Sequence, residues 1–308
     1  MKTHFYVVGE KQREHDVADA VGTGVLACGD EFAKSDAADF VEPDPKVDVA
    51  AVFALKGNAK RILDGYRVMG ARTLLFDKGL IRASTGLGAP NGYYRVSIDE
   101  FMPISRIERM MREGVSPNRW VATGLRPRDR IRIKPDWPVI YAGSSQKYCD
   151  FHGLGDEHEY AVDLIRRIRK KAGKDRPIFY RPKPSFTGAR VVEGTIFSRP
   201  TGERAKDYHV GSLGDLLPKA HALVTHGSHA AIDAILAGVP AIVLGDGAAR
   251  PVAGTSLDDF LNESLVFPDR EKRFAWLSAI SYWQYVVSEM VDGTMWRFLR
   301  EEMERPAA

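Results

Sequence analysis

The chain has 308 residues, which is enough for two domains of ordinary size. Hydrophobic residues make up 44% of it and charged residues 28%, proportions that exclude a disordered or fibrous chain. The formal net charge of +3 does not by itself indicate a polyanionic partner. We expect no membrane span and no signal peptide, because no sufficiently long apolar run occurs. The two cysteines, Cys28 and Cys149, form no metal-binding pattern and fit a reducing cytoplasm.

The first part of the chain alternates short apolar runs with helical patterns. Strands are predicted at 4–8, 47–55 and 73–76, and helices at 15–26 and 58–69. The run at 47–55 is apolar almost throughout, as is typical of a parallel strand that is covered on both faces. Such alternation predicts a doubly wound α/β domain, in which ligands collect beyond the carboxyl ends of the strands. The segment Asp77-Lys78-Gly79 follows a predicted strand and therefore occupies a position of that kind.

The next segment leads toward a second domain. Residues 81–92 are rich in Gly, Ser, Thr, Pro and Asn and are predicted to form an ordered loop that lines a site. An edge strand at 93–98 and a short helix at 106–111 follow. Three prolines between 127 and 138 interrupt a charged connector, which we take as the domain boundary. The predicted organisation is a first domain at 1–136, a second at 137–262 and C-terminal helices at 263–308.

The second half repeats the alternation. Strands are predicted at 139–142 and 177–180, and helices at 160–171 and 213–220. Residues 270–304 are predicted to be helical throughout and are dense in aromatic side chains. These aromatic residues recur at helical spacing, which favours packing over a platform for stacking bases, although both interpretations remain open.

Residues 222–245 are predicted to form a strand, a tight turn, a helix and a second strand. His226-Gly227-Ser228 ends the first strand, Ser228 is a suitable helix N-cap, and Gly238 suits a left-handed C-cap. A glycine turn before a helix N-terminus favours the binding of a phosphate group. The segment contains neither G-x-G-x-x-G nor a P-loop. An ordinary βαβ crossover, whose glycine and serine serve only the turn, is the alternative.

Two parts of this segment, Thr225-His-Gly-Ser228 and Asp233-Ala-Ile-Leu-Ala-Gly-Val-Pro240, resemble the donor-site signature of GT-B glycosyltransferases. The resemblance implies two Rossmann-like domains with a deep cleft between them and C-terminal helices that cross back to the first domain. It also implies that His226, Gly227 and Ser228 hold the donor diphosphate. Asp233 would hold the ribose hydroxyls, with Asp standing where the family usually has Glu.

Loops that follow other strands of the second domain join the predicted donor site. The resemblance and the loop chemistry assign to it Gly143, Ser144, Ser145, Lys147, Arg181, Lys183, Asp246 and Arg250. Gly143 to Ser145 can alternatively be a solvated turn, and Arg181 and Lys183 can be surface charges. Asp246 can be a turn residue, since it precedes a glycine.

Transfer of a sugar needs a group that takes the proton of the acceptor hydroxyl. Asp77 is the predicted base, and Asp30, Asp48, Asp99 and Glu100 are alternatives. A capping or surface role for Asp77 is an equal possibility. No Asp-x-Asp and no histidine cluster with ligand spacing occurs, so a metal-independent enzyme is expected, in which backbone amides, Lys147 and arginines balance the leaving-group charge.

Positive charge is concentrated in two stretches, 106–134 and 166–190. Such clusters are typical of proteins that bind a polyanion, although charge runs more often form a solvated face. The side chains predicted to contact DNA are Arg126, Arg128, Arg130 and Arg132.

Four stretches, Tyr93–Pro103, Ala142–Tyr148, Tyr180–Ser185 and Gly254–Asp259, resemble compact phage-type glycosyltransferases, some of which glycosylate hydroxymethylated pyrimidines in DNA. The resemblance implies UDP-glucose as co-substrate, no further cofactor, and the hydroxymethyl group of 5-hydroxymethylcytosine or 5-hydroxymethyluracil as acceptor, reached by flipping the base. A monomer in the cytoplasm (the host's, if phage-encoded) is expected. The alternatives are a bacterial surface-polysaccharide glycosyltransferase and a non-catalytic protein of the same fold that binds nucleotides or nucleic acid.

Overall fold

The computed structural model describes residues 1–81, 92–134, 136–183, 188–197, 200–201, 207–208, 213–261 and 265–305. The chain folds into two compact units. Unit 1 comprises Met1–Arg119 and Ser278–Ala308, and unit 2 comprises Trp120–Leu277. Nearly all of the loop predicted at 81–92 lies outside the described residues.

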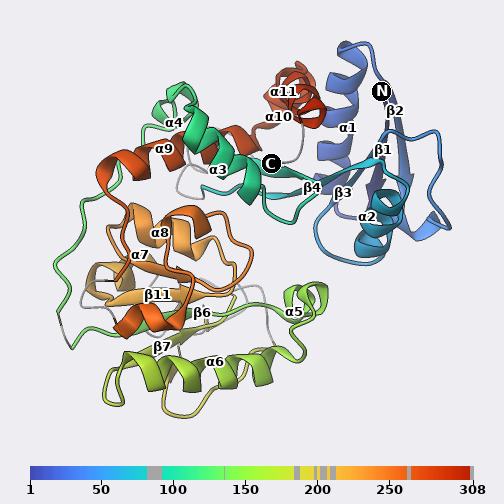
Figure 1. The fold of residues 1–308 in the computed structure, drawn as a ribbon. Coiled ribbons are helices and arrows are strands. Elements are labelled where there is room, and N and C mark those ends of the chain that lie inside the picture. The colour runs from blue at the N-terminus through green and yellow to red at the C-terminus, as the bar shows by residue number, and fades with distance from the viewer. Residues whose placement is uncertain are drawn as a thin grey trace. The chain divides into compact units, whose positions relative to one another are not determined.

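Unit 1 contains strands and helices in alternation, as the apolar pattern predicted (Figure 1). Its elements are β1 (Lys2–Val7), α1 (Gln12–Ala27), β2 (Glu31–Asp36), η1 (Ala37–Asp39), β3 (Val49–Phe53), α2 (Ala59–Val68), β4 (Arg72–Lys78), β5 (Tyr94–Ile98), α3 (Ile104–Glu113), η6 (Ser281–Trp283), β13 (Gln284–Tyr285), α10 (Val287–Val291) and α11 (Thr294–Glu304). The short helix α4 (Asn118–Val121) spans the boundary between the units.

The sheet of unit 1 has the strand order β13-β5-β4-β3-β1-β2. Strands β2, β1, β3 and β4 are parallel, whereas β5 runs antiparallel to β4. The prediction that β5 forms the edge is wrong, because β13 pairs with its outer side and all five of its residues are buried. Strand β2 was not predicted, because its charged, half-exposed residues suit a strand that is paired on one side only.

Helices cover both faces of this sheet. Helix α2 packs on one face, where Tyr66 joins a cluster with Tyr6 and Val52. On the other side, α10 and α11 pack against α1 (Figure 1). A Cβ on Gly24 of α1 would lie 1.9 Å from the carbonyl oxygen of Met290, so only glycine permits this approach of α1 to α10.

The tail is not helical throughout, which corrects the prediction for residues 270–304. Helix α9 (Arg270–Ile280) is followed by η6, β13, α10 and α11. Gly293 has φ of +77° and separates the last two helices. The side chains of Trp276, Trp283 and Trp296 are fully buried, which supports packing as their role.

Unit 2 is a second α/β unit with a five-stranded sheet. Its elements are β6 (Val139–Ala142), α5 (Gln146–His152), α6 (Glu157–Ala172), β7 (Ile178–Arg181), β8 (Ile196–Phe197), β9 (Pro200–Thr201), β10 (Asp207–Tyr208), α7 (Leu213–Leu216), η3 (Leu217–Lys219), β11 (Ala222–Thr225), α8 (Ala230–Leu236), β12 (Ala241–Val243), η4 (Arg250–Val252), η5 (Leu257–Leu261) and most of α9. The five strands are parallel in the order β12-β11-β6-β7-β8, and β9 pairs with β10.

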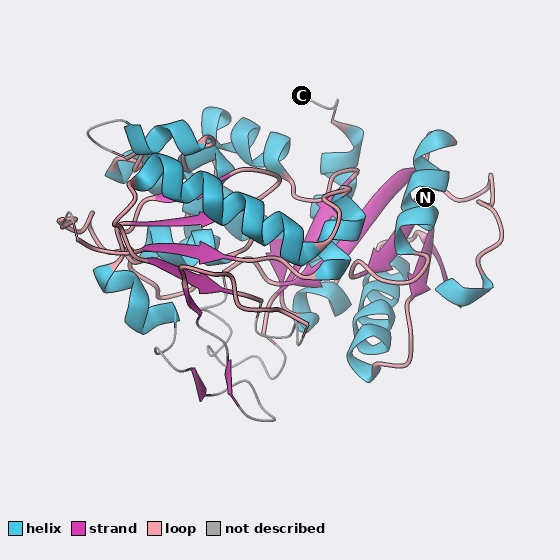
Figure 2. Ribbon diagram, turned by 90° about the horizontal axis from the view of Figure 1, so that it is seen from below, coloured by secondary structure: helices cyan, strands magenta, loops and turns pink. Residues whose placement is uncertain are grey.

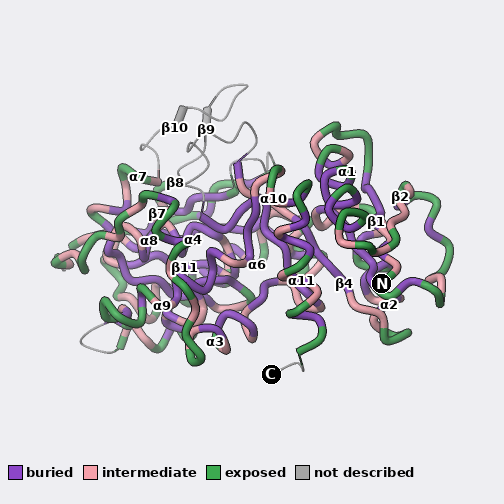
Figure 3. Tube along the Cα trace, turned by 90° about the horizontal axis from the view of Figure 1, so that it is seen from above, coloured by how far each residue is buried: buried purple, intermediate pink, exposed green. Residues whose placement is uncertain are grey.

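The sheet of unit 2 lies between two layers of helix, with α6 on one face and α8 on the other (Figures 1 and 2). Leu164 and Ile168 of α6 pack against Tyr141 and Val224 in one cluster of buried side chains. The central strands are buried along their length (Figure 3). Both units therefore have the doubly wound architecture that the sequence predicts.

The units divide at 119/120 and 277/278, not at the predicted 136/137 and 262/263. The connector joins unit 2 because its backbone is bonded there: Arg128 N donates to Leu236 O at 2.8 Å. Likewise, the indole nitrogen of Trp276 donates to Ala248 O at 2.8 Å, which attaches the first part of α9 to unit 2.

Candidate functional site

Four loops of unit 2 start at the carboxyl ends of its parallel strands. Strands β6, β7, β11 and β12 are parallel and in register, with Ala142 opposite both Arg181 and Thr225, and Thr225 opposite Val243. The loops that follow these strands therefore begin side by side. The chain order reverses between β6 and β11, and crevices at such switch points are where open α/β sheets bind ligands.

A single hydroxyl group holds the predicted donor turn at this switch point. Thr225 Oγ1 donates to Ala142 O on the neighbouring strand at 2.9 Å and accepts from Ser228 N at 3.0 Å. Ser228 Oγ accepts from Ala230 N at 3.2 Å. The helix begins at Ala230, so Ser228 lies before the N-cap and not at it, which corrects the prediction. Gly238 has φ of +83°, as predicted for a left-handed helix end.

The glycines of these loops are needed because the loops pack tightly against each other. A Cβ on Gly227 would lie 2.2 Å from the hydroxyl oxygen of Tyr148 and 2.4 Å from the carbonyl oxygen of Asp246. A Cβ on Gly245 would lie 2.1 Å from Nε2 of His226. Neither position has room for a side chain, so the glycines allow three loops to meet at one place.

His226 is fixed by a residue that the sequence analysis did not assign to the site. The Tyr160 hydroxyl, from α6, lies 2.6 Å from His226 Nδ1. Burial lowers the pKa of His226, an effect that the nearby Asp246 carboxylate partly offsets. Burial also raises the pKa of Tyr160 to about 12, so the phenol keeps its proton at neutral pH. A protonated phenol donating to Nδ1 leaves the other ring nitrogen, Nε2, as the proton carrier.

The other predicted donor-site residues differ in exposure. Ser144 is buried after β6, Ser145 precedes α5, and Lys147 is exposed on that helix. The side chain of Arg181 is buried at the end of β7, while Lys183 is exposed beyond it. Gly143, Ser144 and Ser145 form the loop that leaves β6, whereas Lys147 lies on α5 and Arg181 is the last residue of β7.

Asp233 lies on α8 and is half-buried. Asp246 and Arg250 form an exposed pair with Oδ1 and Nη1 3.9 Å apart, and Arg250 Nη1 also lies 3.5 Å from Gly245 O. Their ligand-binding roles stay predictions.

Asp77 of unit 1 lies within β4, not beyond it. The strand extends to Lys78 because it pairs with β5, and Asp77 stands opposite Arg95. The Asp77 carboxylate lies 3.7 Å from the fully buried guanidinium of Arg95 and remains partly exposed. Asp77 thus has a structural role as counter-charge to Arg95, and its role as catalytic base stays a prediction.

A buried carboxylate that the sequence analysis overlooked lies at the same carboxyl edge of this sheet. Glu14, in the first turn of α1, is 2% exposed and forms an ion pair of 2.8 Å with Lys56, which follows β3. Among the described residues, Glu14 Oε2 has no hydrogen-bond partner. The only sequence signal was its position in the polar stretch after the first strand.

The four alternative bases lie at the amino ends of the parallel strands. Asp30 directly precedes β2, and Asp48 directly precedes β3. Asp99 accepts from Thr73 N at 2.8 Å at the start of β4, and Glu100 follows it in the chain. Since Asp77 and Glu14 lie at the opposite edge, these four carboxylates share no site with them.

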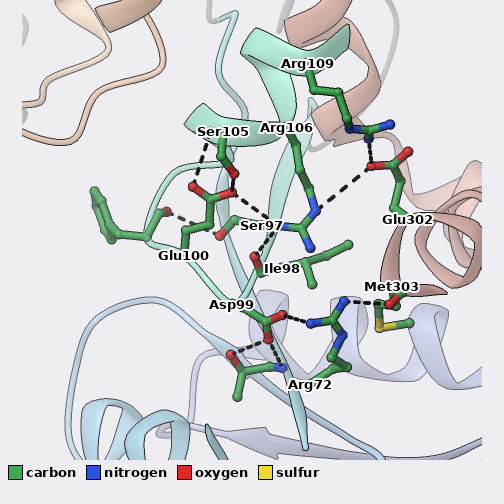
Figure 4. A network of polar contacts seen from close by, with 12 residues as sticks. Arg72, Ser97, Ile98, Asp99, Glu100, Ser105, Arg106, Arg109, Glu302 and Met303 are labelled. Carbon is green, nitrogen blue, oxygen red and sulfur yellow. Dashed lines mark hydrogen bonds and ion pairs between the residues drawn. The ribbon is translucent and has the colours of Figure 1, made fainter. Parts of the chain in front are cut away.

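Several arginines of the predicted basic cluster serve internal contacts. Arg106 and Arg109 of α3 both point toward Glu302 of α11, and Arg106 also contacts Glu100 at 3.3 Å (Figure 4). Arg119 forms an ion pair of 2.6 Å with Glu289. By contrast, Arg126, Arg128, Arg130 and Arg132 are exposed, and no carboxylate of the described residues lies within 4 Å of them. This second group is available to an external anion.

No group of three or more His, Cys, Asp or Glu side chains among the described residues is arranged to hold a metal ion. None of the described helices combines the length and the apolar character that crossing a bilayer requires.

Comparison with known proteins identifies the fold. No protein-family model and no curated protein matches the chain. Among solved structures, the KpsC β-Kdo 2,4 transferase of Thermosulfurimonas dismutans has a TM-score of 0.53 at 11% identity, covering 92% of this chain and 97% of that one. The KpsC β-Kdo 2,7 transferase of the same organism has a TM-score of 0.49 at 12% identity, covering 96% and 99%.

The chain therefore has the GT-B fold, with two Rossmann-like units, as the resemblance implied. The KpsC β-Kdo 2,4 transferase is one structure with this fold, and the low identity limits the likeness to the fold.

Proposed function

We propose that this protein is a glycosyltransferase that moves a sugar from a nucleotide-sugar donor to a hydroxyl group. The observation that carries the proposal is the turn His226-Gly227-Ser228, which Thr225 anchors at the switch point between β6 and β11. The fold shared with a solved sugar transferase supports it. The donor signature and the fold are independent observations, since one rests on local sequence and the other on the whole chain.

The donor is proposed to lie along the carboxyl edge of the unit 2 sheet. The neutral imidazole of His226 and the hydroxyl of Ser228 suit a diphosphate, because they can donate hydrogen bonds without requiring a counter-charge. Lys147 and Arg250 supply positive charge for the leaving nucleotide diphosphate. Asp233 is proposed to accept hydrogen bonds from the ribose hydroxyls. UDP-glucose is the first donor to test.

The chemical step needs a base on the acceptor side. The base takes the proton of the acceptor hydroxyl, whose oxygen forms a bond to the anomeric carbon while the bond from that carbon to the diphosphate oxygen breaks. Asp77 is our proposed base because it is partly exposed at the carboxyl edge of the unit 1 sheet. Glu14 is a competitor at the same edge, since one of its oxygens carries no hydrogen bond among the described residues.

The acceptor has two candidates. A surface polysaccharide is favoured by the shared fold, because one of the matching structures is a Kdo transferase. A hydroxymethylated pyrimidine in DNA is favoured by the exposed row Arg126, Arg128, Arg130 and Arg132, which has the charge to bind phosphates. Both acceptors present a hydroxyl group, so the same chemical step serves either. A monomer acting in the cytoplasm remains our expectation.

The test is a transfer assay with the full chain and a panel of nucleotide sugars. One acceptor arm is an acidic oligosaccharide that contains Kdo, and the other is duplex DNA with 5-hydroxymethylcytosine or 5-hydroxymethyluracil. Mass spectrometry of each acceptor reports the added sugar. Transfer to one arm identifies the acceptor class, and donor hydrolysis without transfer keeps the enzyme class but rejects both acceptors. Nucleotide binding without any turnover would favour the non-catalytic alternative.

A further inference from the structure

Unit 2 contains a second hollow that the donor site does not use. This basic pocket, defined by Arg130, Arg132, Lys134, Arg176, His221 and Phe260, encloses about 480 Å³. Ile131, Ile133, Ala172 and Leu265 complete its apolar wall. The volume falls within the range of small-molecule sites in proteins.

The basic pocket lies at the edge of the sheet opposite to the donor loops. His221 directly precedes β11, and its backbone N donates to Pro138 O, just before β6, at 2.7 Å. Arg176 lies shortly before β7, and its Nη1 donates to Trp137 O at 3.1 Å. These residues mark the amino ends of three parallel strands, whereas the donor loops follow the carboxyl ends. A ligand in the basic pocket would therefore be separate from a donor in the donor site.

Three cations of the basic pocket lie apart from the carboxylates that the structure describes. No carboxylate of the described residues lies within 4 Å of Arg130, Arg132 or Lys134. The Arg176 guanidinium is held by the carbonyl oxygens of Ala172, at 2.9 Å, and Trp137. Burial lowers the pKa of Arg176, and the charge of Asp136 partly offsets this effect. The two carbonyl groups hold the guanidinium in place.

The remaining lining indicates how the rest of a ligand would fit. The rings of His221 and Phe260 lie nearly parallel, with centroids 6.1 Å apart and an interplanar angle of 15°. Burial and the charge of Arg176 lower the pKa of His221 to about 4, so the ring is neutral at pH 7. Its Nδ1 is buried and has no hydrogen-bond partner within the described ranges. The lining thus offers one unused polar atom beside an apolar surface.

We propose that the basic pocket is a second binding site, which takes a small phosphate ester with more than one negative charge. Arginine side chains bind phosphate through paired hydrogen bonds, and several cations in one pocket favour a multiply charged group over a single carboxylate. The organic part of the ester would lie against the apolar wall formed by Phe260 and its neighbours. This proposal concerns binding alone and does not depend on the glycosyl transfer proposed above.

The experiment observes the His221 ring signals by NMR of the full chain with labelled histidine. The ring signals of His221 are assigned by their loss in His221→Gln. Pyrophosphate and UMP are the probes, titrated separately, and inorganic phosphate, which has no organic substituent, serves as the comparison. We expect saturable shifts of the His221 signals with both probes, and weaker binding of inorganic phosphate. Unshifted His221 signals at saturating pyrophosphate would overturn the proposal.

Two matched double variants distinguish binding in a defined pocket from general attraction to positive charge. Arg132→Ala combined with Lys134→Ala removes two cations of the pocket, while Arg126→Ala combined with Arg128→Ala removes two exposed cations of the same segment outside it. The first pair should weaken pyrophosphate binding about tenfold or more, and the second should leave it within about twofold. Equal weakening by both pairs would overturn the proposal, because it would indicate diffuse attraction. A single-stranded oligonucleotide that alone shifts His221 would also overturn it, in favour of a nucleic-acid surface.

Discussion

The hydroxyl group of Tyr160 lies 2.6 Å from Nδ1 of His226, which joins α6 to the turn after β11. The contact fixes the orientation of the imidazole, and when the phenol is the donor, Nε2 is the ring nitrogen that carries the proton. His226 stands in the turn that we propose to hold the donor diphosphate. A residue outside the motif therefore controls the chemistry of one inside it.

Tyr160→Phe should weaken nucleotide binding by roughly 0.5–1.5 kcal/mol, the usual net value of one neutral hydrogen bond. The ring remains, so packing and the unfolding midpoint should change little. Isothermal calorimetry with UDP measures the effect, and thermal unfolding is its control. Unchanged UDP affinity in a folded variant would show that the orientation of His226 does not matter for the donor.

Asp233→Ala should weaken nucleotide binding by roughly 1–3 kcal/mol, because charge-assisted hydrogen bonds to the ribose would be lost. Asp233→Glu restores the side chain length usual in the family and is expected to retain affinity. The comparison of UDP with 2′-deoxy-UDP tests the assignment further. Equal discrimination between these two ligands before and after Asp233→Ala would contradict a ribose contact.

Asp77→Asn and Glu14→Gln separate the two candidate bases. Replacing the carboxylate of the true base by an amide should lower the kcat of the enzyme at least about 100-fold and leave donor affinity unchanged. Asp77→Asn also weakens a contact with the buried Arg95, so its unfolding free energy must be measured alongside. Loss of turnover in proportion to loss of folded protein would assign a structural role to Asp77. An active Asp77→Asn with an inactive Glu14→Gln would move the base to α1.

His221 should make stability depend on pH. Its pKa is about 4 in the folded chain and 6.5 ordinarily, so the unfolded chain binds more protons between these values. The free energy of unfolding should therefore fall as the pH drops from about 6.5 to about 4. Burial lowers the pKa of His226 as well, which changes stability in the same direction. The contribution of His221 is therefore measured as the difference between a variant that lacks it and the unaltered chain. Urea unfolding of His221→Gln across this window should show a shallower pH dependence than the unaltered chain, and identical slopes would contradict the account.

The sequence was sufficient for those parts of the fold that local patterns determine. Apolar runs identified β3, β6 and β11, and Gly238 correctly indicated the end of α8. Prediction from the sequence failed for strands that form through pairing with a neighbour and lack an apolar pattern. The edge strand β2 carries charged residues, and β13 is only two residues long, so neither has an apolar pattern of its own.

The candidate site shows the same division. The turn at 226–228 is visible as a motif because its residues are contiguous. Tyr160 and Glu14 reach their partners only through the packing of α6 and α1, and no spacing in the sequence reports such a contact. The basic pocket was hidden for a similar reason: Arg130 and His221 are far apart in the chain, and the order of strands brings them together.

The central claim is that the chain transfers sugar from a nucleotide. Its most direct test is consumption of UDP-glucose and other nucleotide sugars by the full chain, followed by mass spectrometry of donor and acceptor, with Asp233→Ala as the matched variant. We predict that at least one nucleotide sugar is converted to its nucleotide and that the Asp233 variant needs a higher donor concentration. No consumption and no binding of any nucleotide sugar by the folded protein would contradict the account.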